Sequence, residues 1–185
     1  MKKSTLTIAA FAAMLTAGVL FSCSKDAEKT EPAQKSALQW VGSTSKEISD
    51  MCVRWAHYDS NGNRICDSYP PPNREICWFR ISPDPNNPCY DNALSANITL
   101  DFGIDDEGGN WLHSIRFNVD SASVATMDGD LLAALSDAAL VGSITLHEGI
   151  AVNPDPVLGT IENDLIGGGS FAIKRNDDEI KITIK

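Results

Sequence analysis

Apolar and polar residues alternate along much of the second half of the chain, which is typical of β-strands with one buried face. The segments 96–104 and 110–119 predict two strands joined by a polar loop. A further strand is predicted at 142–152. The last segment, 169–185, predicts a hairpin, and its apolar faces stay together only if its loop has two or four residues.

One segment has the periodicity of a helix instead. Residues 128–140 (DGDLLAALSDAAL) place Leu131 and Leu135 on one face and carry acidic side chains in the first turn. Gly142 follows as a stop signal. The sequence therefore predicts one main helix among the strands.

An Asn-Gly pair predicts a hairpin in the first half. The segment 53–69 contains Asn61-Gly62, which suits the positive φ angles of a type I′ turn. A two-residue loop would place Asp59 opposite Arg64, a favourable cross-strand pair.

The sequence around this hairpin is less regular. A capping box (TSKE) favours a short helical turn at 45–51. Six prolines between positions 69 and 89 exclude most regular structure there and leave only 75–81 as a strand.

These elements predict a single globular domain over residues 38–185, of α+β class and mainly β. We expect an antiparallel sheet or small sandwich with one main helix. Its N-terminal half is expected to be loop-rich, with a disulfide-stapled, proline-rich part at 48–92.

Four cysteines cluster in that part, with separations of 14, 11 and 12 positions: Cys52, Cys66, Cys77 and Cys89. A zinc site is the competing interpretation, but these spacings lack its short C-x₂₋₄-C knuckle. In an exported chain an even number of cysteines indicates two disulfides, each worth about 3 kcal/mol. Three alternative pairings remain open.

The N-terminus carries the signal for export. Two lysines precede an apolar run at 6–21, the layout of a secretory signal peptide, and the run is short for a membrane span. The tetrapeptide LFSC at 20–23 resembles a bacterial lipobox. The resemblance implies removal of residues 1–22 as signal peptide and acylation of Cys23 with diacylglycerol and an amide-linked chain, such as palmitate.

Residues 23–37 then form the lipidated cysteine and a disordered tether, because they contain no aromatic or branched aliphatic side chain. Acyl chains anchor a protein without a spanning helix. The acidic SKDAE at 24–28 resembles the export signal of surface lipoproteins. We expect a lipid-anchored protein of the cell envelope, in the outer membrane and exposed at the surface rather than periplasmic.

The charge excludes one class of partner. The full chain has a formal charge of −10, and loss of residues 1–22, which carry two lysines and no acidic residue, makes it −12. Such a chain repels nucleic acid. The expected partners are the lipid bilayer, through acylated Cys23, and a protein or glycan; we expect no cofactor.

An acidic loop offers oxygen ligands for calcium: Asp101, Asp105, Asp106 and Glu107. Their spacing does not match the D-x-[DN]-x-[DN]-G pattern, so we favour polar turn chemistry and expect no metal.

Local signatures of catalysis are missing. His57, His113 and His147 have no metal-ligand spacing, and we interpret each as an ordinary strand residue. There is no G-x-S-x-G motif. The glycine run 167–169 lacks the lysine and helix of a phosphate loop, and we interpret it as a flexible connection. We therefore assign no catalytic residue.

Aromatic side chains gather near the proline-rich part and are candidates for a surface that recognises sugars or peptides: Trp55, Tyr58, Tyr69, Trp78 and Tyr90. The alternative is that they pack around the disulfides. The tripeptide DSA at 120–122 resembles an O-glycosylation site of surface-displaying bacteria and makes Ser121 a candidate acceptor.

Together these features favour a binding or accessory module over an enzyme. The alternative is an envelope hydrolase acting on glycan or peptide, which a cleft with clustered histidine and carboxylate would favour. A further alternative is a protein inhibitor that presents the stapled loop 68–75 (SYPPPNRE).

Overall fold

The computed structural model describes residues 39–82, 93–104, 107–153 and 160–185. The predicted signal peptide, Cys23 and the tether lie outside the described residues. The same is true of Cys89, Tyr90, Asp105 and Asp106.

The described part is built mainly of strands, in the order β1 (Gln39–Tyr58), β2 (Arg64–Asp67), β3 (Ile76–Ile81), β4 (Ala93–Ile104), β5 (Asn110–Asn118), β6 (Ser143–Val152), β7 (Leu165–Arg175) and β8 (Glu179–Thr183). Two helices, α1 (Ser121–Val124) and α2 (Gly129–Val141), lie between β5 and β6. The mainly β class with one main helix, α2, is confirmed. The predicted strands at 75–81, 96–104, 110–119 and 142–152 and the C-terminal hairpin are also present.

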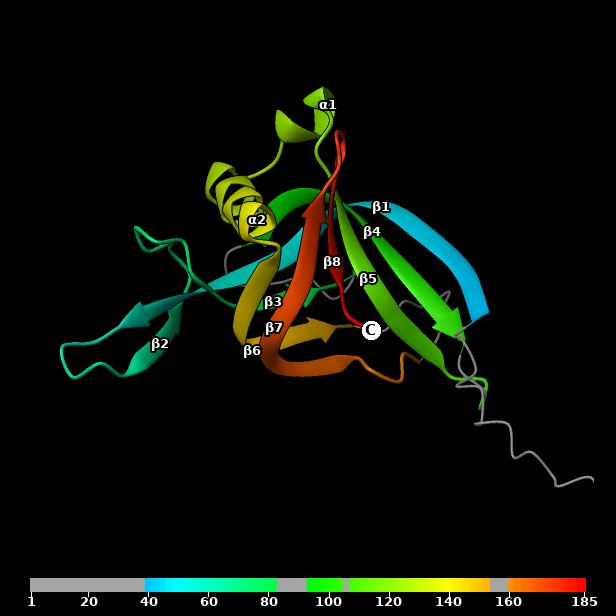
Figure 1. The fold of residues 1–185 in the computed structure, drawn as a ribbon, viewed down its shortest axis with the longest axis horizontal. Coiled ribbons are helices and arrows are strands. Elements are labelled where there is room, and N and C mark those ends of the chain that lie inside the picture. The colour runs from blue at the N-terminus through cyan, green and yellow to red at the C-terminus, as the bar shows by residue number, and fades with distance from the viewer. Residues whose placement is uncertain (1–38, 83–92, 105–106, 154–159) are drawn as a thin grey trace, which may run out of the picture. The chain divides into compact units, whose positions relative to one another are not determined.

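The sheet closes on itself, so the expected open sheet or sandwich is wrong. The strand order β1-β3-β6-β7-β8-β5-β4 returns to β1 through the β1–β4 pairing (Figure 1). All the pairings between these strands are antiparallel except that of β3 with β6. Closure follows from the length of β1, whose 20 residues pair with β4 along one edge and with β3 along the other.

The expected helical turn at 45–51 is wrong, because this segment belongs to β1. Its backbone pairs with β4, for example Ser45 with Thr99, and continuous pairing overrides the local capping signal. From the last residue of this segment onward, Met51, Val53 and Trp55 alternate into the core, as expected for a strand.

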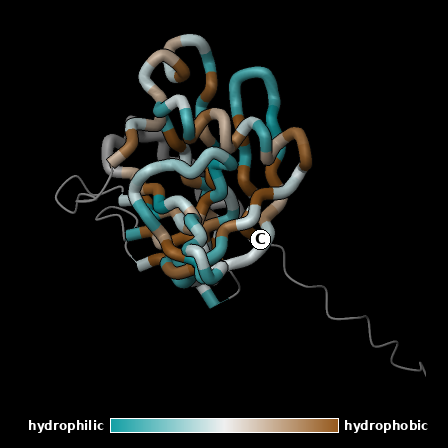
Figure 2. Tube along the Cα trace, turned by 90° about the vertical axis from the view of Figure 1, so that its left-hand side faces the viewer, coloured by the Kyte–Doolittle hydropathy of each residue, from teal (hydrophilic) through white to brown (hydrophobic). Residues whose placement is uncertain are grey.

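The interior of the barrel is filled by one cluster of apolar side chains, of which Trp55, Phe79 and Phe117 are the largest. In Figure 2 hydrophobic and hydrophilic stretches follow one another along the trace, as expected for strands with one face in the core. Leu131 and Leu135 of α2 are fully buried in the same cluster.

Local signals define both ends of α2. The Asp128 carboxylate accepts a hydrogen bond from the Leu131 amide at 2.9 Å, and Gly142 ends the helix with a φ of 84°. The single turn α1 was not expected; it begins where the Asp120 side chain accepts from the amides of Ala122 and Ser123. No helix of the described part has the length and apolar content needed to cross a membrane.

The hairpin between β1 and β2 is present, but its predicted register is wrong by one residue. Tyr58 pairs with Arg64, and the loop spans 59–63. The loop is longer because the Asp59 carboxylate accepts hydrogen bonds from the amides of Asn61 and Asn63, both at 2.8 Å. A disulfide between Cys66 of β2 and Cys77 of β3, with Cα atoms 5.8 Å apart, connects this hairpin to the barrel wall.

Candidate functional site

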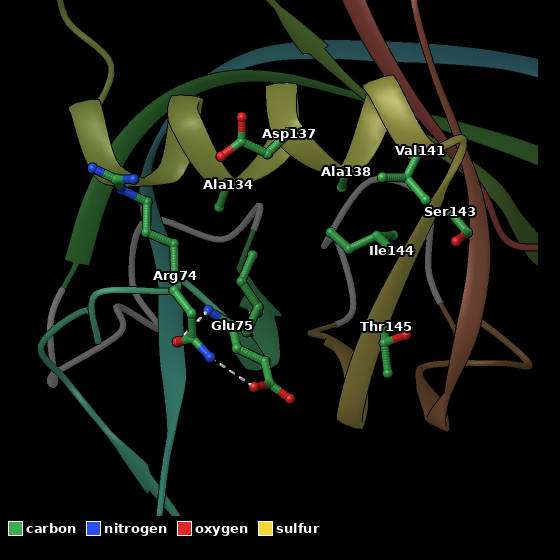
Figure 3. Close-up of a pocket in the computed structure, with 11 residues that line it drawn as sticks. Arg74, Glu75, Ala134, Asp137, Ala138, Val141, Ser143, Ile144 and Thr145 are labelled. Carbon is green, nitrogen blue, oxygen red and sulfur yellow. Dashed lines mark hydrogen bonds between the residues drawn. The ribbon is translucent and has the colours of Figure 1, made fainter.

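A groove of about 410 Å³ opens between α2, the start of β6 and the segment that precedes β3. We call it the α2–β6 groove (Figure 3). It is lined by Asn73, Arg74, Glu75, Ile76, Ala134, Asp137, Ala138, Val141, Ser143, Ile144 and Thr145. Its volume lies within the range of about 300–1,000 Å³ that is typical of ligand sites.

The groove exists because two neighbouring strands of the barrel pair along only part of their length. The parallel pairing of β3 and β6 begins at Trp78 with Gly149, whereas β6 itself begins at Ser143. Before β3 the chain forms a turn in which the Arg74 amide donates to the Pro71 carbonyl at 2.9 Å. Arg74 has a φ of 50°, so the chain changes direction here instead of continuing as a strand along β6.

Three donors hold the carboxylate of Glu75 at the edge of the groove. His147 Nε2 and the Tyr58 hydroxyl both contact Oε1, the latter at 3.0 Å. The Asn73 side-chain amide donates to Oε2 at 3.1 Å. Burial by itself raises the pKa of Glu75, but the hydrogen bonds from His147 and Tyr58 outweigh it and hold this pKa below its ordinary value.

His147 comes to Glu75 because β6 has a bulge. The register of β6 against β7 shifts between Leu146 and Gly149, which adds one residue on the β6 side. Glycines on the facing strand make this close approach feasible: a Cβ at Gly168 would lie 2.1 Å from the His147 carbonyl oxygen. The run 167–169 is therefore part of β7, and its interpretation as a flexible connection is wrong.

The remaining charges of the groove leave it negative. Arg74 Nε donates to the Asp130 carboxylate of α2 at 2.8 Å, so its charge is already matched. Asp137, about two turns further along α2, is exposed at the rim. Glu75 and Asp137 are thus the acidic side chains that line the groove, on opposite sides of it in Figure 3, beside the apolar surface of Ala134 and its neighbours on α2.

The disulfide prediction is confirmed for Cys66 and Cys77. Cys52 is also disulfide-bonded. Glu148 Oε1 lies 3.0 Å from the Cys66 sulfur, and the two sulfurs with this carboxylate form a compact trio. As a disulfide, the two sulfurs offer no thiolate to a metal ion.

The aromatic candidates do not share one surface. Tyr58 and Tyr69 are 52% and 59% exposed, and the Tyr69 ring lies 4.4 Å from that of His57. Trp78 is half-buried and lines a second cavity, of about 340 Å³. Trp55 is only 1% exposed and belongs to the core, so its assignment to a binding surface is wrong.

The acidic candidates also separate. Asp101 is 1% exposed and accepts from the Ser114 hydroxyl at 2.5 Å and from the Arg116 guanidinium at 2.8 Å. The hydrogen bonds from Arg116 to Asp101 and to Glu179 raise the pKa of Arg116. Asp101 is therefore a member of an internal ion pair. Glu107 is exposed. The glycosylation candidate Ser121 is exposed as the first residue of α1.

The stapled loop 68–75 is held against the domain. Arg74 is bound to Asp130 and Pro71 is buried, whereas Tyr69 and Pro72 are exposed. The groove beside the loop is consequently a better-defined ligand site than the loop itself.

Comparisons with protein-family models, curated proteins and solved structures find no match for this chain. The site is therefore interpreted from its own geometry. Sequence reasoning missed the contact between Glu75 and His147, which are 72 positions apart. The parallel register of β3 with β6 and the bulge in β6 bring them together, and neither leaves a local signal in either segment.

Proposed function

We propose that this protein is an envelope-anchored lipoprotein that acts as a binding module, with the α2–β6 groove as its ligand site. The observation that carries the proposal is the groove itself, which opens beside the part of β6 that precedes its pairing with β3. Its polar groups are held in place before a ligand arrives, since Glu75 has three hydrogen-bond donors and Arg74 is fixed by Asp130. Such pre-organisation lowers the ordering cost of binding.

The anchor rests on the resemblance of residues 20–23 to a lipobox. Cys23 would carry the acyl chains, and the polar tether at 24–37 would separate the domain from the bilayer. We place the protein in the outer membrane, exposed at the surface, on the resemblance of SKDAE to a surface-export signal.

The binding function can be tested by blocking the groove. Thr145 is exposed and lines the groove, so Thr145→Arg places a long side chain in it. The control is Thr183→Arg, at an exposed strand position of β8 that does not line the groove. Detergent-solubilised lipoprotein is applied to glycan and peptide arrays. We expect ligands that Thr145→Arg loses and Thr183→Arg keeps; an unchanged profile, or no ligand at all, contradicts the proposal.

A second candidate function is an envelope hydrolase acting on glycan or peptide, and the observation that favours it is the pairing of His147 with Glu75. A carboxylate that orients a histidine is the arrangement of a general base. Among the described residues no serine, threonine or cysteine is hydrogen-bonded to His147, so water would be the nucleophile.

The hydrolase is tested with fluorogenic peptide and glycan substrates. His147→Gln should lower the rate about 10²- to 10⁴-fold if His147 is the base. His113→Gln, on β5, is the matched control and should leave the rate unchanged. If no substrate is cleaved, or if both variants are equally active, the binding module stands alone.

A further inference from the structure

The first part of β6 presents a strand edge to the α2–β6 groove. Pairing with β3 begins at Gly149, so residues 143–148 extend beyond it on that side. Four of these residues span about 13 Å of backbone, at about 3.3 Å per residue. Ser143, Ile144 and Thr145 are small or β-branched, and residues 143–148 contain no lysine or proline of the kind that commonly protects exposed edges. The one acidic residue, Glu148, lies at the end of this segment next to Gly149.

The pairing of β6 with β7 shows which backbone groups face the groove. Ser143 lies opposite Ala172, and the Ile173 amide donates to the Gly142 carbonyl at 3.2 Å. This hydrogen bond lies beside the pair Ser143–Ala172, so in an antiparallel ladder Ser143–Ala172 is a non-hydrogen-bonded pair. The backbone N–H and C=O groups of both residues therefore point away from the partner strand. Because the pattern alternates, the groups of Thr145 point the same way.

The backbone N–H and C=O of Ser143 and Thr145 are thus directed to the side where β3 has not yet begun. In the described part of the chain, no other strand pairs with them there. Both residues line the groove. In Figure 3, Thr145 and Glu75 lie on opposite sides of the groove with α2 above it. The site therefore has the hydrogen-bonding groups and the space for one additional short strand.

We propose that the α2–β6 groove binds an extended peptide, which adds to the free edge of β6 as an extra strand and places a lysine or arginine side chain near Asp137 at the rim. This inference rests on the proposed binding function and names its ligand class. Main-chain hydrogen bonds to Ser143 and Thr145 supply affinity, and side-chain contacts supply specificity, as in other cases of strand addition.

The charge of the site selects the side chain. Asp137 is exposed where it lines the groove, whereas Arg74 is matched by Asp130 and Glu75 is bonded to His147. The formal charge of the whole chain is also strongly negative, which favours the approach of a basic segment. The apolar surface of Ala134, Ala138 and Val141 accommodates the valine or threonine side chains on either side of the basic one.

The probe is a set of fluorescein-labelled, end-blocked hexapeptides of alternating valine and threonine with one central lysine, tested against the full-length lipidated protein in detergent micelles. Anisotropy should report saturable binding. Replacing the lysine by glutamate should weaken binding more than tenfold. Asp137→Asn should weaken binding of the lysine peptide about three- to tenfold, while Asp177→Asn, in the exposed β7–β8 turn, should have no effect.

Backbone recognition is tested by methylating alternate peptide nitrogens. Amides of every second residue point to the same side of a strand. One peptide methylated at the odd positions and a second methylated at the even positions therefore test the two edges of the bound peptide separately. At least one should bind more than tenfold more weakly than the parent. Bound peptide should also slow hydrogen exchange of the Ser143 and Thr145 amides. If both methylated peptides bind like the parent, or neither amide gains protection, strand addition is wrong.

The outcomes separate this inference from the function on which it rests. If a glycan binds, is lost in Thr145→Arg, and no peptide binds, the groove is a ligand site but not for a strand. If peptides bind equally to Thr145→Arg, or if neither class of ligand binds, both proposals are wrong.

Discussion

At the scale of single residues, Glu75 is the side chain on which the site depends. It is the common partner of Tyr58 on β1, Asn73 in the loop and His147 on β6. Its side chain is 29% exposed, so these hydrogen bonds replace part of the water that burial removes. One carboxylate thereby connects three segments that are distant in the sequence.

The first prediction concerns the pH dependence of this contribution. A carboxyl group whose folded pKa is depressed stabilises the fold above its unfolded pKa, and this stabilisation is lost as the pH falls through the folded pKa. Glu75→Gln should therefore lower the free energy of unfolding by about 1–3 kcal/mol at neutral pH. The deficit should shrink below about pH 4.

Urea denaturation at several pH values measures this difference, with Glu162→Gln, at an exposed position, as the matched control. A deficit that is equally large at acidic pH would contradict the depressed pKa of Glu75.

Asp101 gives a second prediction at this scale. Asp101 is buried and forms an ion pair with Arg116, whose side chain is partly exposed. Removing Asp101 leaves the Ser114 hydroxyl without this acceptor and leaves Arg116 with Glu179 as a remaining partner, a loss that typically costs about 1–3 kcal/mol. Asp101→Ala should therefore destabilise the fold by this amount, measured by chemical denaturation. Asp164→Asn, at an exposed position, should change stability by less than about 0.5 kcal/mol.

Asp101 also shows a limit of sequence reading. Its position in the acidic stretch 101–107 made it a calcium candidate. The pairing of β4 with β5 instead places it beside Ser114, and Arg116 lies two residues further along the same strand. Which acidic residue of a cluster points to solvent is decided by strand register, and the residue types alone do not encode that register.

At the scale of elements, the sequence predicted the features that local signals determine better than those that long-range strand pairing determines. The helix α2 was predictable because its cap, its apolar face and its terminal glycine lie within one short segment. The capping box at 44–47 is also a local helix signal, but this segment pairs with β4 as part of β1 and forms no helix. The groove was not predictable, because it depends on the residue at which β3 and β6 begin to pair.

The third prediction concerns the disulfide that braces the β1–β2 hairpin. The Glu148 carboxylate lies beside the Cys66 sulfur, where its negative charge repels an incoming thiolate and disfavours a departing one. Glu148→Gln should therefore speed reduction of Cys66–Cys77 by a small dithiol about three- to tenfold.

Alkylation of quenched samples followed by peptide mass analysis gives the rate for each cysteine. The disulfide of Cys52 in the same molecule is the internal control, and its rate should not change. Equal acceleration at Cys52 would indicate general loosening of the fold instead of a local charge effect.

At the scale of the whole molecule, closure of the barrel determines where a partner can bind. Closed sheets have few free edges, since each strand has a neighbour on both sides. In the described part of this barrel the partial pairing of β3 with β6 restores such an edge, and α2 lies over it. The disulfide and the Arg74–Asp130 ion pair hold the surrounding segments, so the edge remains accessible without opening the barrel.

The last prediction concerns the attachment of this molecule to the membrane. With two or three acyl chains on Cys23, binding to the bilayer is stable, because each buried CH₂ contributes about 0.8 kcal/mol. Without that thiol no chain can be attached, and the remaining chain is acidic and polar at its N-terminus. Cys23→Ser should therefore abolish labelling by a fatty-acid analogue, whereas Ser24→Ala should preserve it. Membrane retention of unlabelled Cys23→Ser protein would show that another segment, such as the apolar run at 6–21, provides the anchor.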